Sequence, residues 1–206
     1  MGFHDGEWIG KRAARRLAEF GHCTILPGLS EDEFERIEGE FGFAFADDHR
    51  AFLAAGLPSG PGRWPDWRAG DSNALRGQLG WPVEGLLFDV ENNDFWVEDW
   101  GDRPDSMDDA FAVAGRHLAA VPKMVPIYGH RYLPPGRGTW GHPVLSMHQA
   151  DIIFYGADLV DYVGREFAPD RTPVGADVVA TVPFWTDVLD ANNDPEATYP
   201  LKLKPR

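Results

Sequence analysis

Residues 29–41, LSEDEFERIEGEF, constrain the fold more than any other segment, because every local signal in them indicates one helix. Ser30 is a favoured N-cap residue, and Glu33 three positions later completes a capping box. Apolar residues recur there at helical spacing, at Phe34, Ile37 and Phe41. The segment is therefore expected to form an amphipathic helix that buries this stripe against a core and ends at Gly42.

Weaker periodicity predicts further helices. The expected segments are residues 7–20, residues 47–56, a short helix that Asp71 caps and that runs through Leu75 and Leu79, residues 107–121, and residues 157–167. Basic side chains cluster in residues 7–20, and they are expected to form a solvated face rather than a nucleic-acid site.

Short apolar runs bounded by turn residues predict strands. They are residues 85–90, 124–129, 131–134, 144–148 and 151–156. The connections after residue 124 are short, so these strands are expected to pair mostly antiparallel. The expected fold class is α+β, with a central, mostly antiparallel sheet and helices packed around it, and not a doubly wound parallel sheet.

The 206 residues of the chain correspond to one ordinary domain. The expected organisation is an N-terminal amphipathic helix within residues 1–24, an α+β domain over residues 25–190, and a polar tail over residues 191–206. The apolar run VPFWTDVLD, residues 182–190, is expected to pack back on the domain. The tail is expected to be frayed, because it is polar and terminal.

Charge excludes several functional classes. The chain has 33 acidic and 19 basic residues, a formal net charge of −14. Nucleic-acid binding is not expected, because phosphate contacts need clustered Lys and Arg, and docking on an anionic membrane is not expected either. No run reaches the about 18 apolar residues of a spanning helix, and the N-terminus does not read as a secretory signal. A cytoplasmic protein is expected.

Sequence motifs for catalysis are mostly missing. The chain contains no G-x-S-x-G, no Walker A loop and no dinucleotide-binding fingerprint. Cys23, the single cysteine, follows His22 directly, and adjacent side chains on an extended chain point to opposite sides. A structural cysteine is therefore expected, and neither a disulfide nor a multi-cysteine zinc site can form within one chain.

Two groups of residues are candidates for a metal site, but no metal or cofactor is expected. The histidines of the strand region, with Asp151 nearby, lack tight ligand spacing and are interpreted as turn histidines: His130, His142 and His148. Asp89, Glu91 and Asn93 begin like a calcium loop. The match fails at the sixth and twelfth positions, where Asp94 and Trp100 stand instead of Gly and Glu.

The most unusual segment is residues 84–109, named here the acidic segment. It holds ten acidic residues and one base, Arg103, and so carries −9 of the net charge. One interpretation is a solvated loop whose tryptophans turn into the core. The other is a recognition surface, in which aromatic rings anchor a basic partner and carboxylates steer it. The expected contact residues are Trp64, Trp67, Glu91, Asp94, Trp96, Glu98, Asp99 and Trp100.

The run LPGLSEDEFERIEGEFGFAFADDHRAFLAAG resembles the N-terminal signature of the SUKH superfamily. The matching positions are Phe43, Phe45, Asp48, Arg50, Phe52 and Leu53. Ala46 stands in place of the usual Pro, and His49 in place of the usual aromatic residue. The segments GWPVEGLLFDVENNDFWVEDWG, VPIYGHRYLP, GHPVLSMHQADIIFYG and ADLVDYVGREF are similar to those of actinobacterial cell-wall-assembly-regulator-like members. The resemblance covers residues 25–190.

The resemblance implies an α+β domain with a central sheet and no shared catalytic residues. Many bacterial members of the superfamily are immunity proteins that bind a secreted toxin, often a nuclease, and others are adaptors. The chain is therefore interpreted as a non-enzymatic immunity protein whose partner is a basic protein such as a toxin domain. Two alternatives remain: an adaptor or regulator that binds a cellular protein or ligand, and a hydrolase that uses clustered carboxylates or histidines.

Overall fold

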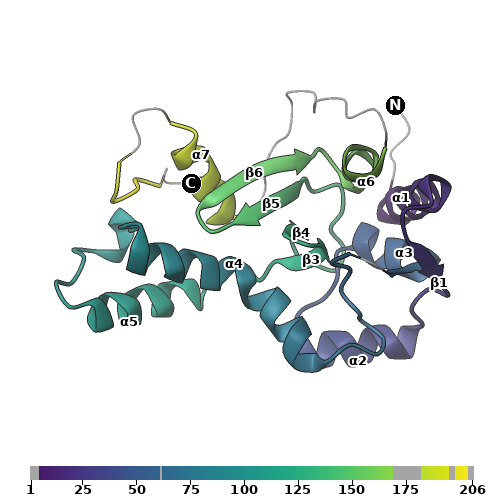
Figure 1. Ribbon diagram of the computed structural model, residues 1–206, viewed down its shortest axis with the longest axis horizontal. Coiled ribbons are helices and arrows are strands. Elements are labelled where there is room, and N and C mark those ends of the chain that lie inside the picture. The colour runs from purple at the N-terminus through teal and green to yellow at the C-terminus, as the bar shows by residue number, and fades with distance from the viewer. Residues whose placement is uncertain (1–4, 61, 169–181, 195–197, 204–206) are drawn as a thin grey trace. The chain divides into compact units, whose positions relative to one another are not determined.

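The computed structural model describes residues 5–60, 62–168, 182–194 and 198–203 (Figure 1). The predicted α+β fold class is confirmed, since helices accompany two small antiparallel sheets. The helices are α1 (Gly6–Phe20), α2 (Glu31–Phe41), α3 (Asp47–Ala55), α4 (Ser72–Asn92), α5 (Met107–Leu118), α6 (Leu159–Phe167), α7 (Trp185–Asn192) and the 3-10 turn η1 (Glu98–Trp100). The strands are β1 (Thr24–Leu26), β2 (Leu57–Ser59), β3 (Val125–Tyr128), β4 (Arg131–Leu133), β5 (Val144–His148) and β6 (Asp151–Gly156).

The described residues belong to two compact units, each drawn from three stretches of the chain. Unit 1 takes its residues from Met1–Leu79, Lys123–Leu145 and Phe154–Ala180. Unit 2 takes its residues from Gly80–Pro122, Ser146–Ile153 and Thr181–Arg206. Strands β1 and β2 form one sheet, and the other sheet has the strand order β3-β4-β5-β6.

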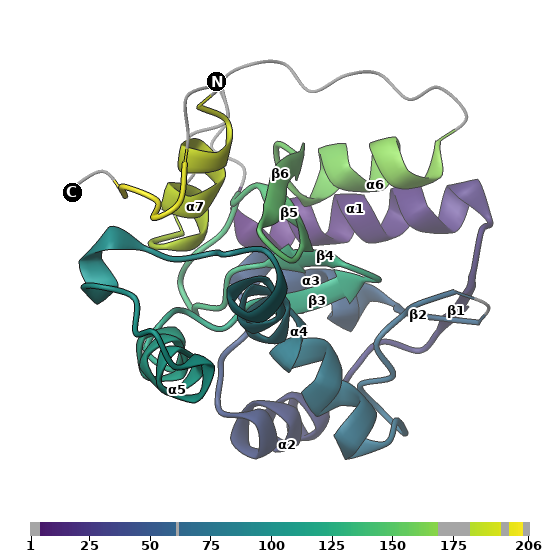
Figure 2. The same cartoon turned by 60° about the vertical axis from the view of Figure 1, so that its left-hand side comes forward.

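Helix α1 is part of the core of unit 1. Both views place it between α3 and α6 (Figures 1 and 2). Its apolar stripe of Ile9, Ala13 and Leu17 is buried. A side chain at Gly10 would place its Cβ 2.2 Å from the carbonyl oxygen of Asp48, so a glycine is what permits α1 and α3 to approach this closely.

Helix α2 forms as the sequence predicts. The Ser30 Oγ accepts a hydrogen bond from the Glu33 backbone N–H at 3.3 Å, and the Glu33 carboxylate accepts one from the Ser30 N–H at 2.8 Å. Phe34, Ile37 and Phe41 are all buried. Gly42 ends the helix with a φ of 67°, in the left-handed region that favours glycine.

The prediction of a strand at residues 85–90 is wrong. Those residues lie in α4, which starts near Asp71 as predicted but continues to Asn92 with Pro82 inside it. A short apolar run fits a strand and a buried helix equally well. The helix is favoured because buried residues recur every three or four positions through the segment, at Leu79, Pro82, Leu86 and Val90.

Part of the C-terminal segment pairs with another segment of unit 2. The prediction of a frayed tail is therefore wrong for the described residues of that tail. Leu201 is buried and forms a parallel bridge with Val97. Its N–H donates to the Trp96 carbonyl at 2.7 Å, and its carbonyl accepts from the Glu98 N–H at 2.9 Å. Helix α7 packs back as expected, with Trp185 buried and its indole N–H donating to the Pro122 carbonyl at 2.7 Å.

The described helices contain none that combines the length and the apolar character needed to cross a membrane.

Candidate functional site

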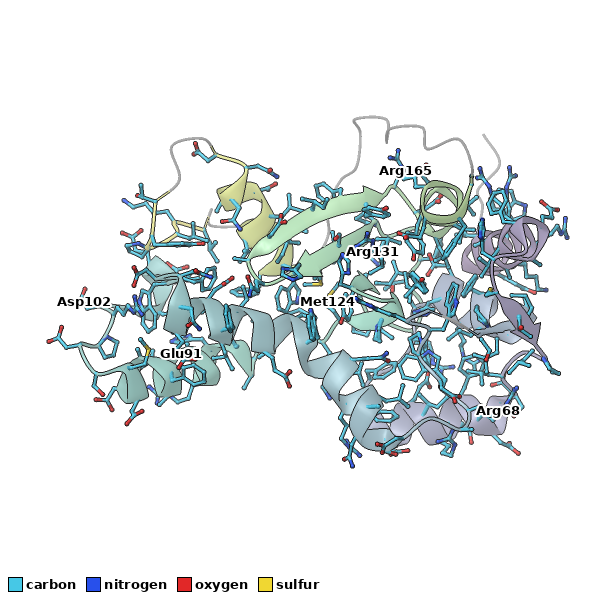
Figure 3. All side chains as sticks on the ribbon, viewed as in Figure 1. Arg68, Glu91, Asp102, Met124, Arg131 and Arg165 are labelled. Atoms are coloured by element: carbon cyan, nitrogen blue, oxygen red, sulfur yellow. The ribbon has the colours of Figure 1, made fainter. Side chains whose placement is uncertain are left out.

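The acidic segment lies on the surface of unit 2. Nine of its ten carboxylates are exposed, and only Asp89 is buried. Figure 3 labels Glu91 near the end of α4 and Asp102 in the loop that leads to α5. Exposure of these acids is what an electrostatic recognition surface requires.

Few cations balance these carboxylates. Arg103 pairs with Asp94 at 2.7 Å, and Lys202 lies 3.7 Å from Glu98. Within the described part of the chain, the other exposed acids of the segment form no ion pair: Glu84, Glu91, Asp99, Asp102, Asp105, Asp108 and Asp109. The segment therefore keeps most of its negative charge available to an external cation.

Two of the predicted anchor residues in this segment face inward to different degrees. Trp96 is 2% exposed, and its indole N–H donates to the Gly101 carbonyl at 2.7 Å. Trp100 is half-buried and stacks on His117, with ring centroids 5.6 Å apart and an interplanar angle of 13°. Trp96 thus offers no side-chain surface to a partner, and for this residue the interpretation of a core tryptophan holds.

The other two predicted anchors lie in unit 1 and not in unit 2. Trp67 is 1% exposed and packs edge-on against Phe45, with centroids 5.4 Å apart. Trp64 is half-buried and stacks on Phe167 at 5.4 Å. The structure therefore gathers six of the eight predicted contact residues in unit 2 and uses Trp67 as a core residue of unit 1.

The sequence interpretation missed two exposed rings on α4. Trp81 is 46% exposed and Phe88 is 47% exposed. Both lie one heptad apart on the helix face opposite Leu86 and Val90, which are buried. Glu84 and Glu91 alternate with the rings on the same face and are exposed. This set, called the α4 stripe, consists of Trp81, Glu84, Phe88 and Glu91.

The strand interpretation concealed this stripe. In a strand, Leu86, Phe88 and Val90 would share one face, because side chains alternate with a period of two. In the observed helix, Phe88 points away from the other two. A helical reading that joined Trp81, Glu84, Phe88 and Glu91 by the spacing i, i+3, i+7 and i+10 would have found it.

Asp89, the buried carboxylate, has a structural role. One of its oxygens accepts from the Asn93 side chain at 2.6 Å, and the other accepts from the Ala150 N–H at 2.7 Å. It therefore fastens the β5–β6 turn to α4. Asp89 is buried and Glu91 is exposed, so the helix directs their side chains to different sides. In a calcium loop the two side chains would have to converge on one ion.

The candidate nucleophile and metal ligands are also dispersed. Burial is the main cause that raises the pKa of Cys23, which disfavours the reactive thiolate. His130 and His142 lie in unit 1, whereas His148 lies in unit 2. Burial lowers the pKa of His142. Among the residues that the structure describes, no three His, Cys, Asp or Glu side chains gather so as to hold a metal ion.

The comparisons with known proteins identify no relative: no protein-family model, no curated protein and no solved structure matches the chain.

Proposed function

We propose that the protein is a non-enzymatic binding domain that captures a basic protein through the acidic segment of unit 2. One observation carries this proposal: exposed carboxylates without ion pairs lie in the same unit as the α4 stripe, whose two rings are also exposed. The carboxylates attract the partner at long range and speed its association. Trp81 and Phe88 supply the apolar contact that slows dissociation.

Arginine and lysine on the partner fit the α4 stripe chemically. A carboxylate and an aromatic ring that alternate along one helix face can bind the same cation from two sides. The carboxylate forms a charge-assisted hydrogen bond, and the ring face attracts the cation through its quadrupole. The stripe thus favours a partner with several basic residues over one that is only apolar.

The proposed partner is a toxin that acts on nucleic acid, as the resemblance to the SUKH superfamily implies. A nuclease must present a cationic surface to hold phosphates, and an acidic protein can cover that surface. The protein would then act as an immunity protein in the cytoplasm of the cell that makes the toxin. An adaptor that binds a cellular basic protein would use the same surface.

Co-expression tests this function directly. Cells that express a toxin encoded beside this gene should survive when they also express the full chain. The variant E84K/E91K should fail to protect, whereas E19K/E35K, which changes the charge equally at exposed positions of unit 1, should protect fully. The immunity role would be rejected if no such toxin is encoded there, or if neither the wild type nor E19K/E35K protects the cells. Capture of a cellular basic protein by the purified wild type, but not by E84K/E91K, would then support the adaptor.

A further inference from the structure

A cavity of about 570 Å³ opens in unit 1, and its lining includes no residue of the acidic segment or the α4 stripe. The small apolar side chains of its lining, called here the alanine floor, are Ala51, Ala54 and Ala55 of α3. Trp140, from the loop before β5, lines it and is 46% exposed. The cavity thus combines an apolar floor that admits an alkyl chain with an exposed aromatic ring.

Acidic side chains predominate among the charged groups of this cavity. It is lined by the carboxylates Asp5, Glu7, Glu31 and Asp47 and by the cations Lys11 and Arg50. Both cations already have partners, because Lys11 pairs with Glu7 at 2.5 Å and Arg50 forms two hydrogen bonds with Glu31. The Arg50 hydrogen bond is also the main cause that lowers the pKa of Glu31.

Two carboxylates remain without a cation within the described residues. Asp5 caps α1 and accepts a hydrogen bond from the Trp8 N–H at 2.9 Å. Asp47 begins α3 and accepts one from the Gly138 N–H at 2.9 Å. Neither forms an ion pair with a described side chain, so the cavity keeps a net negative charge that a ligand can neutralise.

The backbone on both sides of Trp140 is attached to the start of α3. The Asp47 N–H donates to the Thr139 carbonyl at 2.8 Å. The Gly141 N–H donates at 2.9 Å to the carboxylate of Asp48, which is fully buried. The indole is therefore held at the cavity by its neighbours while its own ring stays exposed, and little ordering is needed before a ligand binds.

We propose that this cavity binds a lysine or arginine side chain of a peptide. The alkyl part of the side chain lies along the alanine floor, and the cationic head lies against the Trp140 ring, between Asp5 and Asp47. An anion is disfavoured because the two cations are already paired. An uncharged apolar ligand is disfavoured because its binding would desolvate carboxylates without compensating them. This site is independent of the acidic segment, which belongs to unit 2.

Peptide titration followed by NMR tests the proposal on the full chain. The probes are the peptides Gly-Gly-Lys-Gly-Gly and Gly-Gly-Arg-Gly-Gly, with Gly-Gly-Glu-Gly-Gly as the charge control and butylamine as a free amine. The lysine and arginine peptides should shift the Trp140 indole N–H and the Gly138 and Gly141 amides saturably. The glutamate peptide should not, and butylamine should bind more weakly than the lysine peptide.

Variants separate this site from the rest of the protein. W140A should weaken binding of the lysine peptide by about fivefold or more, as expected for the loss of a cation–π contact. D5N/D47N should do the same, and it keeps an amide oxygen for each backbone hydrogen bond, so the fold is retained. W8A removes a neighbouring exposed tryptophan that does not line the cavity, and E19K/E35K reverses two exposed charges of unit 1 that do not line it either; both should leave peptide binding unchanged.

Three results would overturn the proposal: no saturable shift with the basic peptides, equal binding of the glutamate peptide, or unchanged affinity in D5N/D47N. Equal affinity for butylamine and the lysine peptide would overturn the assignment to a peptide. Loss of peptide binding in E84K/E91K, with binding retained in W140A, would place the peptide on unit 2 and overturn the assignment to this cavity.

Discussion

Trp67 in unit 1 and Trp81 in unit 2 have opposite roles. Trp67 is 1% exposed and contacts the rings of Phe41, Phe43 and Phe45, so it belongs to the core. Trp81 is 46% exposed and lies on an acidic helix face. Tryptophan content therefore does not indicate a binding surface. The helix face on which a ring lies, and the charge beside that ring, decide its role.

The largest effect we expect is on stability, from loss of the buried ring. W67A should lower the free energy of unfolding by about 3–5 kcal/mol, because it leaves a large cavity in a core. W81A should change it by less than about 0.5 kcal/mol, as surface substitutions usually do. Urea denaturation of both variants measures the difference. Similar losses in W67A and W81A would contradict the assignment of Trp67 to the core and of Trp81 to the surface.

W67F refines this test. The Trp67 indole N–H is buried and has no hydrogen-bond partner in the part of the chain that the structure describes, so phenylalanine removes an unsatisfied donor together with part of the ring. W67F should therefore retain more stability than W67A. A loss as large as that in W67A would show that the size of the ring matters more than its chemistry.

The next largest effect concerns the surface of unit 2. E84K/E91K should slow association with the proposed toxin partner about 10- to 100-fold at low ionic strength and reduce the salt dependence of that association. E19K/E35K makes the same change in net charge on exposed residues of unit 1 and should have a much smaller effect. Stopped-flow kinetics at several salt concentrations distinguishes the local from the global contribution of charge. Equal slowing in both variants would mean that net charge alone steers the partner.

Acid should affect the core of unit 1 through His49. Burial lowers the pKa of His49 to about 3, and neither of its ring nitrogens has a hydrogen-bond partner among the described residues. The unfolded chain binds a proton near pH 6.5 that the folded chain does not, so this residue costs stability as pH falls from 6.5 towards 3. The free energy of unfolding of H49F, relative to that of the wild type, should therefore rise by about 1.4 kcal/mol for each unit by which the pH falls from 6 to 4.

Asp48 changes stability in the opposite direction over part of this range. Burial raises its pKa to about 6, so the folded chain gains stability as pH falls from 6 towards 3.8. The two effects offset each other in the wild type, and H49F should expose the gain from Asp48. Unfolding measured by urea at pH 6, 5 and 4 gives both slopes. A constant difference between H49F and the wild type would contradict the neutral, buried state of His49.

The smallest effect compares two helix caps. S30A removes a complete capping box in unit 1 and should cost about 1 kcal/mol. S106A in unit 2 removes a single hydrogen bond of 3.4 Å to the Asp109 N–H and should cost less. Thermal or urea unfolding of both variants measures the two costs. A larger loss of unfolding free energy in S106A than in S30A would show that neither the hydrogen-bond length nor the capping box determines which cap is more stabilising.

Local signals predicted most of the fold. The capping box at Ser30 predicted α2, and helical periodicity predicted α1, α3, α5 and α6. The short apolar runs predicted β3–β6. Helix α4 was missed in part because the run at residues 85–90 is too short to distinguish a strand from a helix. The helix is favoured by Asp89, which is buried and accepts a hydrogen bond from the N–H of Ala150, a residue distant in the chain.

The candidate site was predicted less completely. The exposure of its carboxylates could be anticipated, because charged runs seldom enter a core. The burial of Trp67 and Trp96 could not, because it depends on which distant residues cover each ring. Phe88 was missed because it was assigned to a strand, and Trp81 because it lay between the predicted helix and that strand. The Trp140 cavity joins α1, α3 and a loop that are far apart in sequence.

Dissociation of the complex with the proposed toxin partner tests the central claim most directly, namely the proposal that the α4 stripe anchors a basic partner. The double variant W81A/F88A should raise the dissociation rate constant about tenfold or more, because both rings are removed from the contact. W8A/I25A removes two apolar side chains of comparable exposure from unit 1 and should leave that rate unchanged. An unchanged rate in W81A/F88A, or an equal rise in both variants, would contradict the claim.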